Sequence, residues 1–212
     1  REGIIIGDQI NGRHLILRTG NAGVTWQRID SVDVPRPLPV ENGFAASGTC
    51  ITVSKSGRFF IGLGGEQARI FSSINGYKWK AKTTPLVHGD PSSGIYSMHA
   101  CGTGKMMAVG GDYSKPDSSH YPIISMNDGK SWITTKGKVD GHRSVITYSK
   151  KGKFWVTGGT NGLDLSTDDG ATWTKFSFQD VNTIRVFPHT TKAIAANSKG
   201  EIFLFEFVMG KS

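Results

Sequence analysis

The sequence repeats one short motif four times: TGNAGVTW (19–26), SSINGYKW (72–79), SMNDGKSW (125–132) and STDDGATW (166–173). Each copy ends in tryptophan, and consecutive tryptophans lie 53, 53 and 41 residues apart. A repeat period of about 40–50 residues is typical of propeller blades and solenoid arrays. The motif therefore predicts a repeat architecture, around which the remaining sequence can be interpreted.

Between the motifs, short stretches rich in β-branched and aromatic residues alternate with glycine-bearing turns, as expected for strands joined by hairpins. No helical periodicity of useful length is visible. The predicted strands are 3–8, 14–19 and 24–29 in the first repeat; 43–54, 58–65, 68–73 and 77–83 in the second; 93–100, 105–111, 121–126 and 131–137 in the third; 143–149, 153–159, 162–167 and 171–178 in the fourth; and 182–187, 192–197 and 201–207 in the last.

This division predicts an all-β protein, a β-propeller of four-stranded antiparallel blades in a single domain over residues 1–212. The strands make about five blades or part-blades, whereas propellers usually close a ring of four to eight. We therefore expect one or more N-terminal blades to be absent from this chain. The alternatives are a small closed five-bladed ring and closure by a second chain. A glycine pair ends the second strand of three repeats, which predicts crowding near the propeller axis.

The motif is expected to lie on the hairpin between the third and fourth strands of a blade. An Asp or Asn side chain can hold the turn by accepting hydrogen bonds from main-chain N–H groups, and glycine supplies the positive φ. We expect the tryptophan to bury its apolar surface against the next blade. In the second copy Ile74 replaces the acidic residue, so that turn should be less tightly fixed. The predicted structural residues are Asn21, Trp26, Trp79, Asn127, Trp132, Asp168 and Trp173.

The motif resembles the Asp-box, or BNR repeat, of sialidases, sortilin-type receptors and related propellers. The stretches GDQINGRHLILRT, ENGFAASGTC, GLGGEQARIFSS and AVGGDYSKP are similar to an uncharacterised family of BNR proteins labelled "oxidoreductase" and related to photosystem II stability/assembly factor-like propellers. The resemblance covers nearly the whole chain. It implies a seven-bladed ring with further blades at the N-terminus, and it favours an extracytoplasmic location. A fold-level likeness does not transmit function.

Composition limits the function classes. The net charge is +8 and the pI about 9.5, but the lysines are scattered and no nucleic-acid-binding module is visible, so nucleic acid is not an expected partner. Attraction to an acidic partner stays plausible. No run of about 18 apolar residues predicts a membrane span. Cys50 and Cys101 fall in different blades and are interpreted as buried thiols, not as a disulfide framework.

A binding site is expected on the propeller face opposite the tryptophan motifs, because variable loops on a rigid scaffold concentrate functional residues. Its candidate ligand-binding residues are Glu41, Ser47, Thr49, Glu66, Arg69, Asp112, Tyr113, His142 and Arg143, with further hydroxyls from Ser93, Ser97 and Ser144. A channel lined by these groups would suit a small polar ligand, a glycan or a protein partner. The alternative is a water-filled channel whose polar groups only satisfy one another.

Two kinds of enzyme are alternatives to this binding role. A sialidase needs three arginines, for which Arg18, Arg69 and Arg143 are candidates, and a glycosidase needs two carboxylates about 5–10 Å apart, such as Glu41 and Glu66 or Glu66 and Asp112. No glycine-rich fingerprint opens a helix, so no nucleotide cofactor is expected, and the histidines show no metal-ligand spacing. We therefore expect a non-catalytic binding or assembly propeller without cofactor or metal, with a sialidase-like glycoside hydrolase as the alternative.

The expected site and scaffold residues differ in their predicted contribution to stability. Trp173→Ala should cost roughly 3–5 kcal/mol, as large aromatic truncations in a core do. Asp168→Ala should cost about 1 kcal/mol, the scale of one hydrogen bond. Arg69→Ala and Arg143→Ala should change stability little if both side chains face an open channel.

Overall fold

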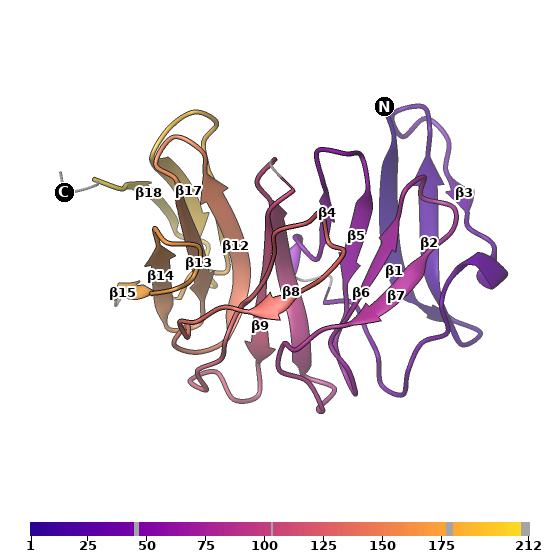
Figure 1. Ribbon diagram of the computed structural model, residues 1–212, viewed down its shortest axis with the longest axis horizontal. Coiled ribbons are helices and arrows are strands. Elements are labelled where there is room, and N and C mark those ends of the chain that lie inside the picture. Colours follow the sequence, from indigo (N-terminus) through magenta and orange to yellow (C-terminus); the bar gives the residue numbers. More distant parts are fainter. Residues whose placement is uncertain (45–46, 103, 177–179, 209–212) are drawn as a thin grey trace.

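The computed structural model describes residues 1–44, 47–102, 104–176 and 180–208 and arranges them as five antiparallel sheets side by side (Figure 1). We call these sheets blades 1 to 5 in chain order. Their strands are β1 (Gly3–Ile10), β2 (Arg13–Thr19) and β3 (Gln27–Arg28) in blade 1; β4 (Ile51–Val53), β5 (Phe59–Gly62), β6 (Arg69–Ser73) and β7 (Lys80–Thr83) in blade 2; β8 (Ser93–Ala100), β9 (Met106–Asp112), β10 (Ile123–Ser125) and β11 (Ile133–Thr134) in blade 3; β12 (Arg143–Ser149), β13 (Phe154–Gly159), β14 (Gly162–Ser166) and β15 (Thr174–Phe176) in blade 4; and β16 (Thr183–Val186), β17 (Lys192–Ala196) and β18 (Ile202–Glu206) in blade 5.

Each four-stranded blade is a simple meander whose first strand contacts the first strand of the next blade. A 3-10 turn, η1 (Ser31–Asp33), lies on the connection from blade 1 to blade 2. No helix in the described ranges has the length and apolarity that crossing a membrane requires. The predicted all-β class and the meander construction of the blades are confirmed.

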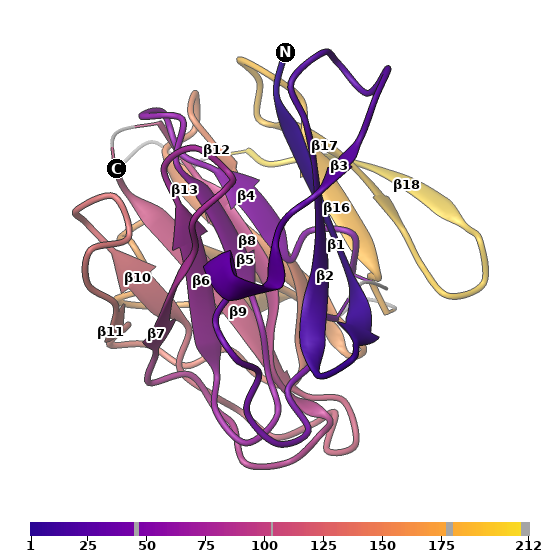
Figure 2. The same cartoon turned by 90° about the vertical axis from the view of Figure 1, so that its right-hand side faces the viewer.

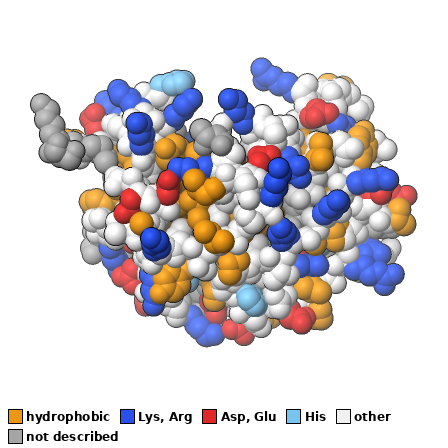
Figure 3. Space-filling model, viewed as in Figure 1, with side chains coloured by type: hydrophobic (Ala, Val, Ile, Leu, Met, Phe, Trp, Pro, Cys, Tyr) orange, Lys and Arg blue, Asp and Glu red, His pale blue; other side chains and the backbone are white. Residues whose placement is uncertain are grey.

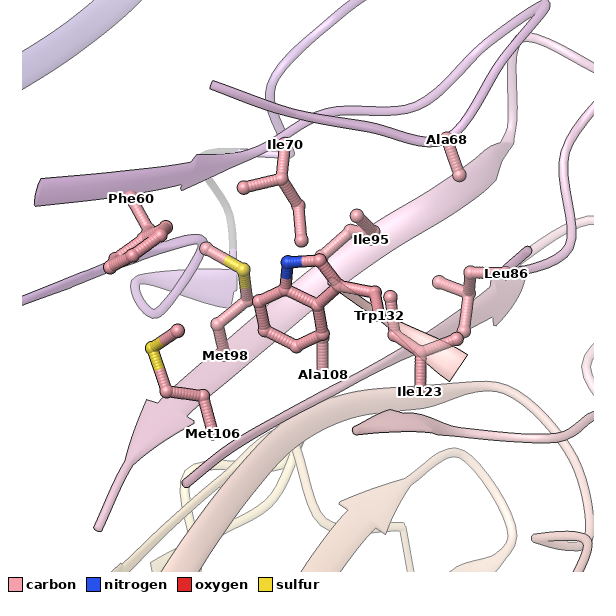
Figure 4. Packing of buried hydrophobic residues seen from close by; sticks show 10 residues of the cluster. All are labelled: Phe60, Ala68, Ile70, Leu86, Ile95, Met98, Met106, Ala108, Ile123 and Trp132. Atoms are coloured by element: carbon pink, nitrogen blue, oxygen red, sulfur yellow. The ribbon is translucent and has the colours of Figure 1, made fainter. Parts of the chain in front are cut away.

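Apolar side chains fill the space between consecutive blades. The cluster between blades 2 and 3 is built from β5, β6, β8, β9 and β10, and the indole of Trp132 lies at its centre (Figure 4). Similar clusters join blades 1 and 2, blades 3 and 4, and blades 4 and 5. The core is therefore a row of interfaces between sheets, and each blade depends on its neighbours for burial.

The outer strands are shorter than the sequence predicted, because the tryptophan motifs remain turns up to the tryptophan itself. In blade 1 the strand expected at 24–29 contains only β3, since Asn21 Oδ1 accepts the main-chain N–H of Thr25 at 2.9 Å. The strand predicted over 43–54 begins only with β4, and its residues 45–46 lie outside the described ranges. The predicted strand 171–178 is reduced to β15, and its residues 177–178 also lie outside them.

The four motifs form hairpin turns between the last two strands of blades 1 to 4, as predicted; we call them the tryptophan turns. In blade 4, Asp168 Oδ1 accepts the N–H of Thr172 at 2.9 Å, and Asp168 Oδ2 accepts its hydroxyl at 2.7 Å. Ser166 Oγ accepts the N–H of Gly170 at 2.8 Å. In blade 3, Asn127 and Ser125 make the corresponding main-chain contacts. The turn is thus held by side chains that take the place of main-chain acceptors.

The turn of blade 2 differs from the prediction that Ile74 occupies the acidic position. Ser73 Oγ accepts the N–H of Gly76 at 2.8 Å, and Asn75 Oδ1 accepts the N–H of Tyr77 at 3.0 Å. Asn75 therefore replaces the acidic residue in a turn that is one residue shorter, and Ile74 is 72% exposed. The premise that Ile74 leaves this turn without a side-chain acceptor was therefore wrong, because Ser73 and Asn75 supply the acceptors.

The tryptophans pack against the preceding blade, not against the next one as expected. Trp79 of blade 2 joins the cluster with blade 1, Trp132 of blade 3 joins that with blade 2, and Trp173 of blade 4 packs on that with blade 3. Trp26 of blade 1 has no preceding blade in this chain and is 41% exposed. Figure 2 shows blade 1 at the end of the row, with no sheet over its outward side.

Blade 5, at the opposite end, also presents an uncovered face. Its β16–β18 sheet buries Ile184 and Ala195 toward blade 4. The alternate residues Ile194, Ile202 and Leu204 point the other way and are exposed, Leu204 by 77%. Among the described residues no apolar cluster joins blade 5 to blade 1, so the five sheets form an open row.

Glycines at the ends of the second strands confirm the predicted crowding near the inner strands. A Cβ atom at Gly64 would lie 2.3 Å from the carbonyl oxygen of Ser93, and one at Gly110 would lie 1.8 Å from that of Gly94. Such distances leave no room for any side chain.

The expectation of buried thiols is confirmed for Cys50, whereas Cys101 is half-buried with its Sγ 3.4 Å from the Lys105 carbonyl oxygen.

Candidate functional site

The two ends of the blades carry different structures. The tryptophan turns lie at the same end of the blades as the β4–β5 and β8–β9 hairpins. The blade 3 turn shows this directly: its Asp128 accepts the Ser56 hydroxyl at 2.6 Å and donates its N–H to the carbonyl oxygen of Gly104 at 2.8 Å. The longer connections, which contain 36–44, 64–69, 89–93, 112–120 and 140–144, lie at the other end of the blades. We call this end the loop face. It contains most of the candidate ligand-binding residues.

Glu41 is fully buried and belongs to an ion-pair network. Its carboxylate accepts Nη2 of Arg69 and the N–H of Leu38, the latter at 2.8 Å, while His14 Nε2 lies 3.7 Å away. Burial alone would raise the pKa of Glu41, but His14, the Leu38 amide and the Arg69 guanidinium outweigh it and hold the pKa below its usual range. Arg69 also donates to the Arg36 carbonyl oxygen at 2.9 Å. The pair fixes the 36–41 loop onto blade 2.

Arg143 does not face an open channel, contrary to the sequence-based expectation, because its side chain is completely buried. Its Nε donates to Asp164 Oδ2 at 2.6 Å, and its Nη1 donates to Asn161 Oδ1 at 2.7 Å. Further bonds reach the carbonyl oxygens of Asp140 at 2.9 Å and His142 at 3.1 Å. These acceptors engage all three nitrogen atoms of the guanidinium, Nε, Nη1 and Nη2. The side chain therefore connects the loop before β12 to β14. Asp164 and Asn161 were not identified from the sequence.

The hydroxyl candidates mostly connect inner strands. Thr49 Oγ1 donates to Ser97 Oγ at 2.7 Å, and Ser97 Oγ accepts the N–H of Ile146 at 2.9 Å. Ser97 thereby links blades 2, 3 and 4. Ser47 donates to the carbonyl oxygen of Tyr96, again between blades 2 and 3. For these residues the alternative reading, in which polar groups satisfy one another, describes the observed contacts.

Asp112 is also engaged within the protein. Its Oδ1 accepts the N–H of Ser114 at 2.9 Å and its hydroxyl at 2.6 Å, and Oδ2 lies 3.2 Å from Lys115 Nζ. Burial would raise the pKa of Asp112, but these hydrogen bonds dominate and hold the pKa well below its usual range. Ser93 and Ser144 donate to main-chain oxygens at 2.9 and 3.2 Å.

An aromatic cluster connects the loop face with the inner strands. The ring of Phe44 stacks on Tyr96 with centroids 3.8 Å apart, and His142 meets Tyr96 edge-on at 4.4 Å. Tyr113 lies 6.5 Å from Tyr96 in a T-shaped arrangement and is 58% exposed. Burial, reinforced by the nearby Arg143 charge, lowers the pKa of His142 to about 4, so its ring is neutral near pH 7. Sequence reasoning identified Tyr113 and His142 but missed Phe44 and Tyr96.

The candidates therefore divide into two groups. Glu41, Arg69, Asp112 and Arg143 are held in ion pairs or hydrogen bonds within the protein. Glu66 and Tyr113 are exposed at the loop face. A partner that approaches this face meets an exposed tyrosine on an aromatic cluster, with a carboxylate from the neighbouring blade's loop. A ligand-binding role for these residues stays a prediction.

Comparisons with solved structures identify the architecture. The chain is similar to YCF48 from Cyanidioschyzon merolae, with 12% identity and a TM-score of 0.56 over 98% of this chain. It is similar to PorZ of Porphyromonas gingivalis (11%, TM-score 0.61, 95% of this chain) and to the β-propeller domain of Cps50 (Swd1) from Myceliophteria thermophila (10%, TM-score 0.59, 92% of this chain). The fold is that of a β-propeller. At such identities the likeness establishes the fold alone.

The chain spans 66% of the YCF48 chain, 31% of PorZ and 64% of the Swd1 propeller domain. No family model and no curated protein matches the sequence. The five sheets therefore correspond to part of the length of these propellers.

Proposed function

We propose that this chain belongs to a non-catalytic propeller that binds a protein partner or a polar ligand, including a glycan, through its loop face. The observation that supports this most is the exposed Tyr113 on the Phe44–Tyr96–His142 cluster. A tyrosine that packs edge-on against one neighbouring ring offers a large contact surface at a small cost in side-chain entropy, as in many binding interfaces. Variable loops at one end of a rigid sheet array are a common location for such surfaces.

The state of the carboxylates favours binding over glycoside hydrolysis. A hydrolase needs one carboxyl group as an acid and a second as a base or nucleophile. Glu41 and Asp112 have their pKa held down by hydrogen bonds, and only Glu66 of the three predicted carboxylates is exposed. A carboxylate locked in an ion pair is a poor proton donor near neutral pH.

We further propose that the chain is of the Asp-box, or BNR, type and that additional blades or a second chain complete its ring. The turn geometry around Asp168, Asn127 and Asn21 supports the first part, because all three accept the same main-chain N–H four residues later. The exposed Trp26 and the apolar outer face of blade 5 support the second, because both occupy positions that are covered wherever a neighbouring blade exists.

Site-directed photo-crosslinking in the native cells tests the binding role. A photoreactive residue in place of Tyr113 should give a discrete adduct, and the same residue in place of Lys150, at the opposite end of blade 4, should not. Glu66→Ala should weaken the adduct at position 113 without changing the fold. Absence of an adduct, or the same adducts from both positions, would contradict the loop face as the binding surface.

A panel of fluorogenic glycosides, including sialosides, tests the enzymatic alternative. We expect no turnover above buffer. Turnover that disappears in Glu66→Gln would overturn the non-catalytic assignment. This variant is more informative than Arg143→Ala, because loss of activity after removal of a buried arginine reports unfolding as readily as chemistry.

A further inference from the structure

A groove that the proposed binding face does not include runs along the outer edge of blade 2. It lies where β7 faces the tryptophan turn of blade 3, and its lining includes Arg58, Ser72, Lys80, Lys82, Lys130 and Trp132. It continues past Lys78 to the tryptophan turn of blade 2, sharing Arg58, Ser72 and Lys80 with that extension. Figure 3 shows lysine and arginine side chains gathered over the part of this face where β7 lies.

The positive charge of the groove is not balanced within the described part of the molecule. Lys78, Lys80, Lys82 and Lys130 are exposed, and none of them forms an ion pair with a described residue. Lys82 instead donates to the carbonyl oxygen of Lys130. The nearest carboxylate to Arg58 is Asp128, at 3.8 Å. Cations gathered in a concave surface add their fields and attract anions.

Two shielded donors in the groove lining make no hydrogen bond, Arg58 Nε and Trp132 Nε1. Arg58 Nε has an ion-pair partner in Asp128 Oδ2 at 3.8 Å. Trp173 Nε1 shares this property, whereas Trp79 Nε1 donates to the Gly76 carbonyl oxygen at 3.1 Å. Because Trp132 Nε1 is enclosed in the cluster between blades 2 and 3, a ligand in the groove cannot reach it. The exposed cations are therefore the groups that the groove offers to an anion.

We propose that this groove, the β7 groove, binds an acidic, extended peptide segment of a partner protein. Lys80 and Lys82 alternate along β7, so their Cα atoms are separated by about 6.5–7 Å, the repeat of two strand residues. Acidic residues at every second position of an extended peptide have the same separation. Lys78, in the tryptophan turn just before β7, adds a further charge to the groove lining, as do Arg58 and Lys130. The partner class follows from charge complementarity along one line.

Single-stranded nucleic acid fits the groove less well, although it is also a polyanion. Proteins that bind it combine a basic groove with aromatic faces on which bases stack. Trp132 is the aromatic residue in the lining of the groove between the blades, and it is 8% exposed because its ring is packed between blades 2 and 3 (Figure 4). It therefore offers no free face for stacking.

Fluorescence anisotropy with defined probes tests the proposal. One labelled probe alternates glutamate with serine over ten residues, and the second has the same composition with all glutamates in one block. We expect the alternating peptide to bind more tightly, and about 300 mM salt to weaken it through screening. The double variant Lys80→Glu/Lys82→Glu should weaken binding about tenfold or more, since both cations are replaced by like charges.

The matched control is Lys150→Glu/Lys151→Glu, which changes the net charge equally at the exposed β12–β13 turn. It should leave the affinity within about twofold, and circular dichroism should show that both double variants are folded. Equal weakening by the two double variants, or equal affinity for the two peptides, would overturn the proposal. The proposal would also be overturned if a heparin fragment or an oligodeoxythymidine bound more tightly than the alternating peptide and this binding disappeared in Lys80→Glu/Lys82→Glu. Because none of these changes lies on the loop face, their failure leaves the proposed function untouched.

Discussion

The guanidinium of Arg143 has a structural role that its sequence context hides. In sequence, an arginine after Gly-His at the start of a strand resembles a loop residue that is available to a ligand. In the structure it is completely buried and bonds Asp164, Asn161 and two main-chain carbonyl oxygens. Removal of one partner of a buried ion pair leaves an uncompensated charge, which costs more than the pair itself contributes.

We predict that Arg143→Ala lowers the free energy of unfolding by about 3–5 kcal/mol, because Asp164 then stays buried without its partner. Chemical denaturation followed by tryptophan fluorescence measures the difference. Arg28→Ala is the control, since Arg28 is exposed on β3 and should change stability by about 0.5 kcal/mol or less. Equal midpoints for wild type and Arg143→Ala would mean that the buried network contributes nothing. This prediction replaces the sequence-based one, in which Arg143 was solvated.

The buried histidines give a second prediction at the residue scale. Burial is the main reason that the pKa of His120 falls to about 3 and that of His142 to about 4, with Arg143 adding to both effects. In the unfolded chain both groups protonate near pH 6.5. Between pH 6.5 and about 4 the unfolded state therefore binds more protons than the folded state. The free energy of unfolding is thus highest above pH 6.5 and decreases as the pH falls toward about 4.

We expect the free energy of unfolding to fall by about 2 kcal/mol per histidine between pH 7 and pH 4.5. His120→Phe should reduce this pH dependence by roughly a third, because burial also lowers the pKa of His99 to about 4, and His99 then contributes alongside His142. His189→Asn, at an exposed position, should retain the pH dependence. Denaturant titrations at both pH values measure the difference. The same stability at pH 7 and pH 4.5 would show that the two rings are not held neutral.

At the scale of elements, the tryptophan turns show how much the sequence could predict. Glycine, a hydroxyl residue and an Asp or Asn at fixed distances from a tryptophan were sufficient to place four hairpins, because these contacts are local. The blade 2 turn was misread, because alignment on Trp79 put Ile74 opposite Asp168. The chain instead deletes one residue and uses Ser73 and Asn75 as acceptors. Alignment on a single residue cannot detect such a shift.

The revised assignment predicts different effects for two neighbouring residues. Asn75→Ala should destabilise the protein by about 1 kcal/mol, because two main-chain N–H groups lose their acceptor. Ile74→Asp, which restores the apparent motif, should change stability by about 0.5 kcal/mol or less, since position 74 is exposed. Thermal unfolding of both variants, compared with Asp168→Ala, gives the ranking. A clear gain of stability in Ile74→Asp would restore the original alignment.

At the scale of the whole molecule, the blade order and the layered core followed from the repeat, whereas the site did not. Strand patterns and the 40–50-residue period depend on sequence-local information. The ion pair of Glu41 with Arg69 joins two segments that are far apart in the sequence, and no sequence pattern indicates that they meet. The same is true of the pair of Arg143 with Asp164. The Phe44–Tyr96 stack likewise joins residues from two blades. Polar residues predicted for a site were therefore often the residues that join the blades.

The direction of tryptophan packing gives the last prediction. Each of Trp79, Trp132 and Trp173 packs against the blade before it, so in the completed ring that we propose Trp26 would contact a preceding blade. In this 212-residue chain, Trp132→Ala should cost roughly 3–5 kcal/mol and Trp26→Ala about 1 kcal/mol or less, because only Trp132 is withdrawn from water. In a protein in which a further blade or a second chain covers blade 1, Trp26→Ala should cost as much as Trp132→Ala. Denaturation of both variants, in this chain alone and in the completed ring, measures the two differences. If Trp26→Ala costs little in both settings, the outward face of blade 1 is a solvent-exposed end, and the ring is closed in some other way.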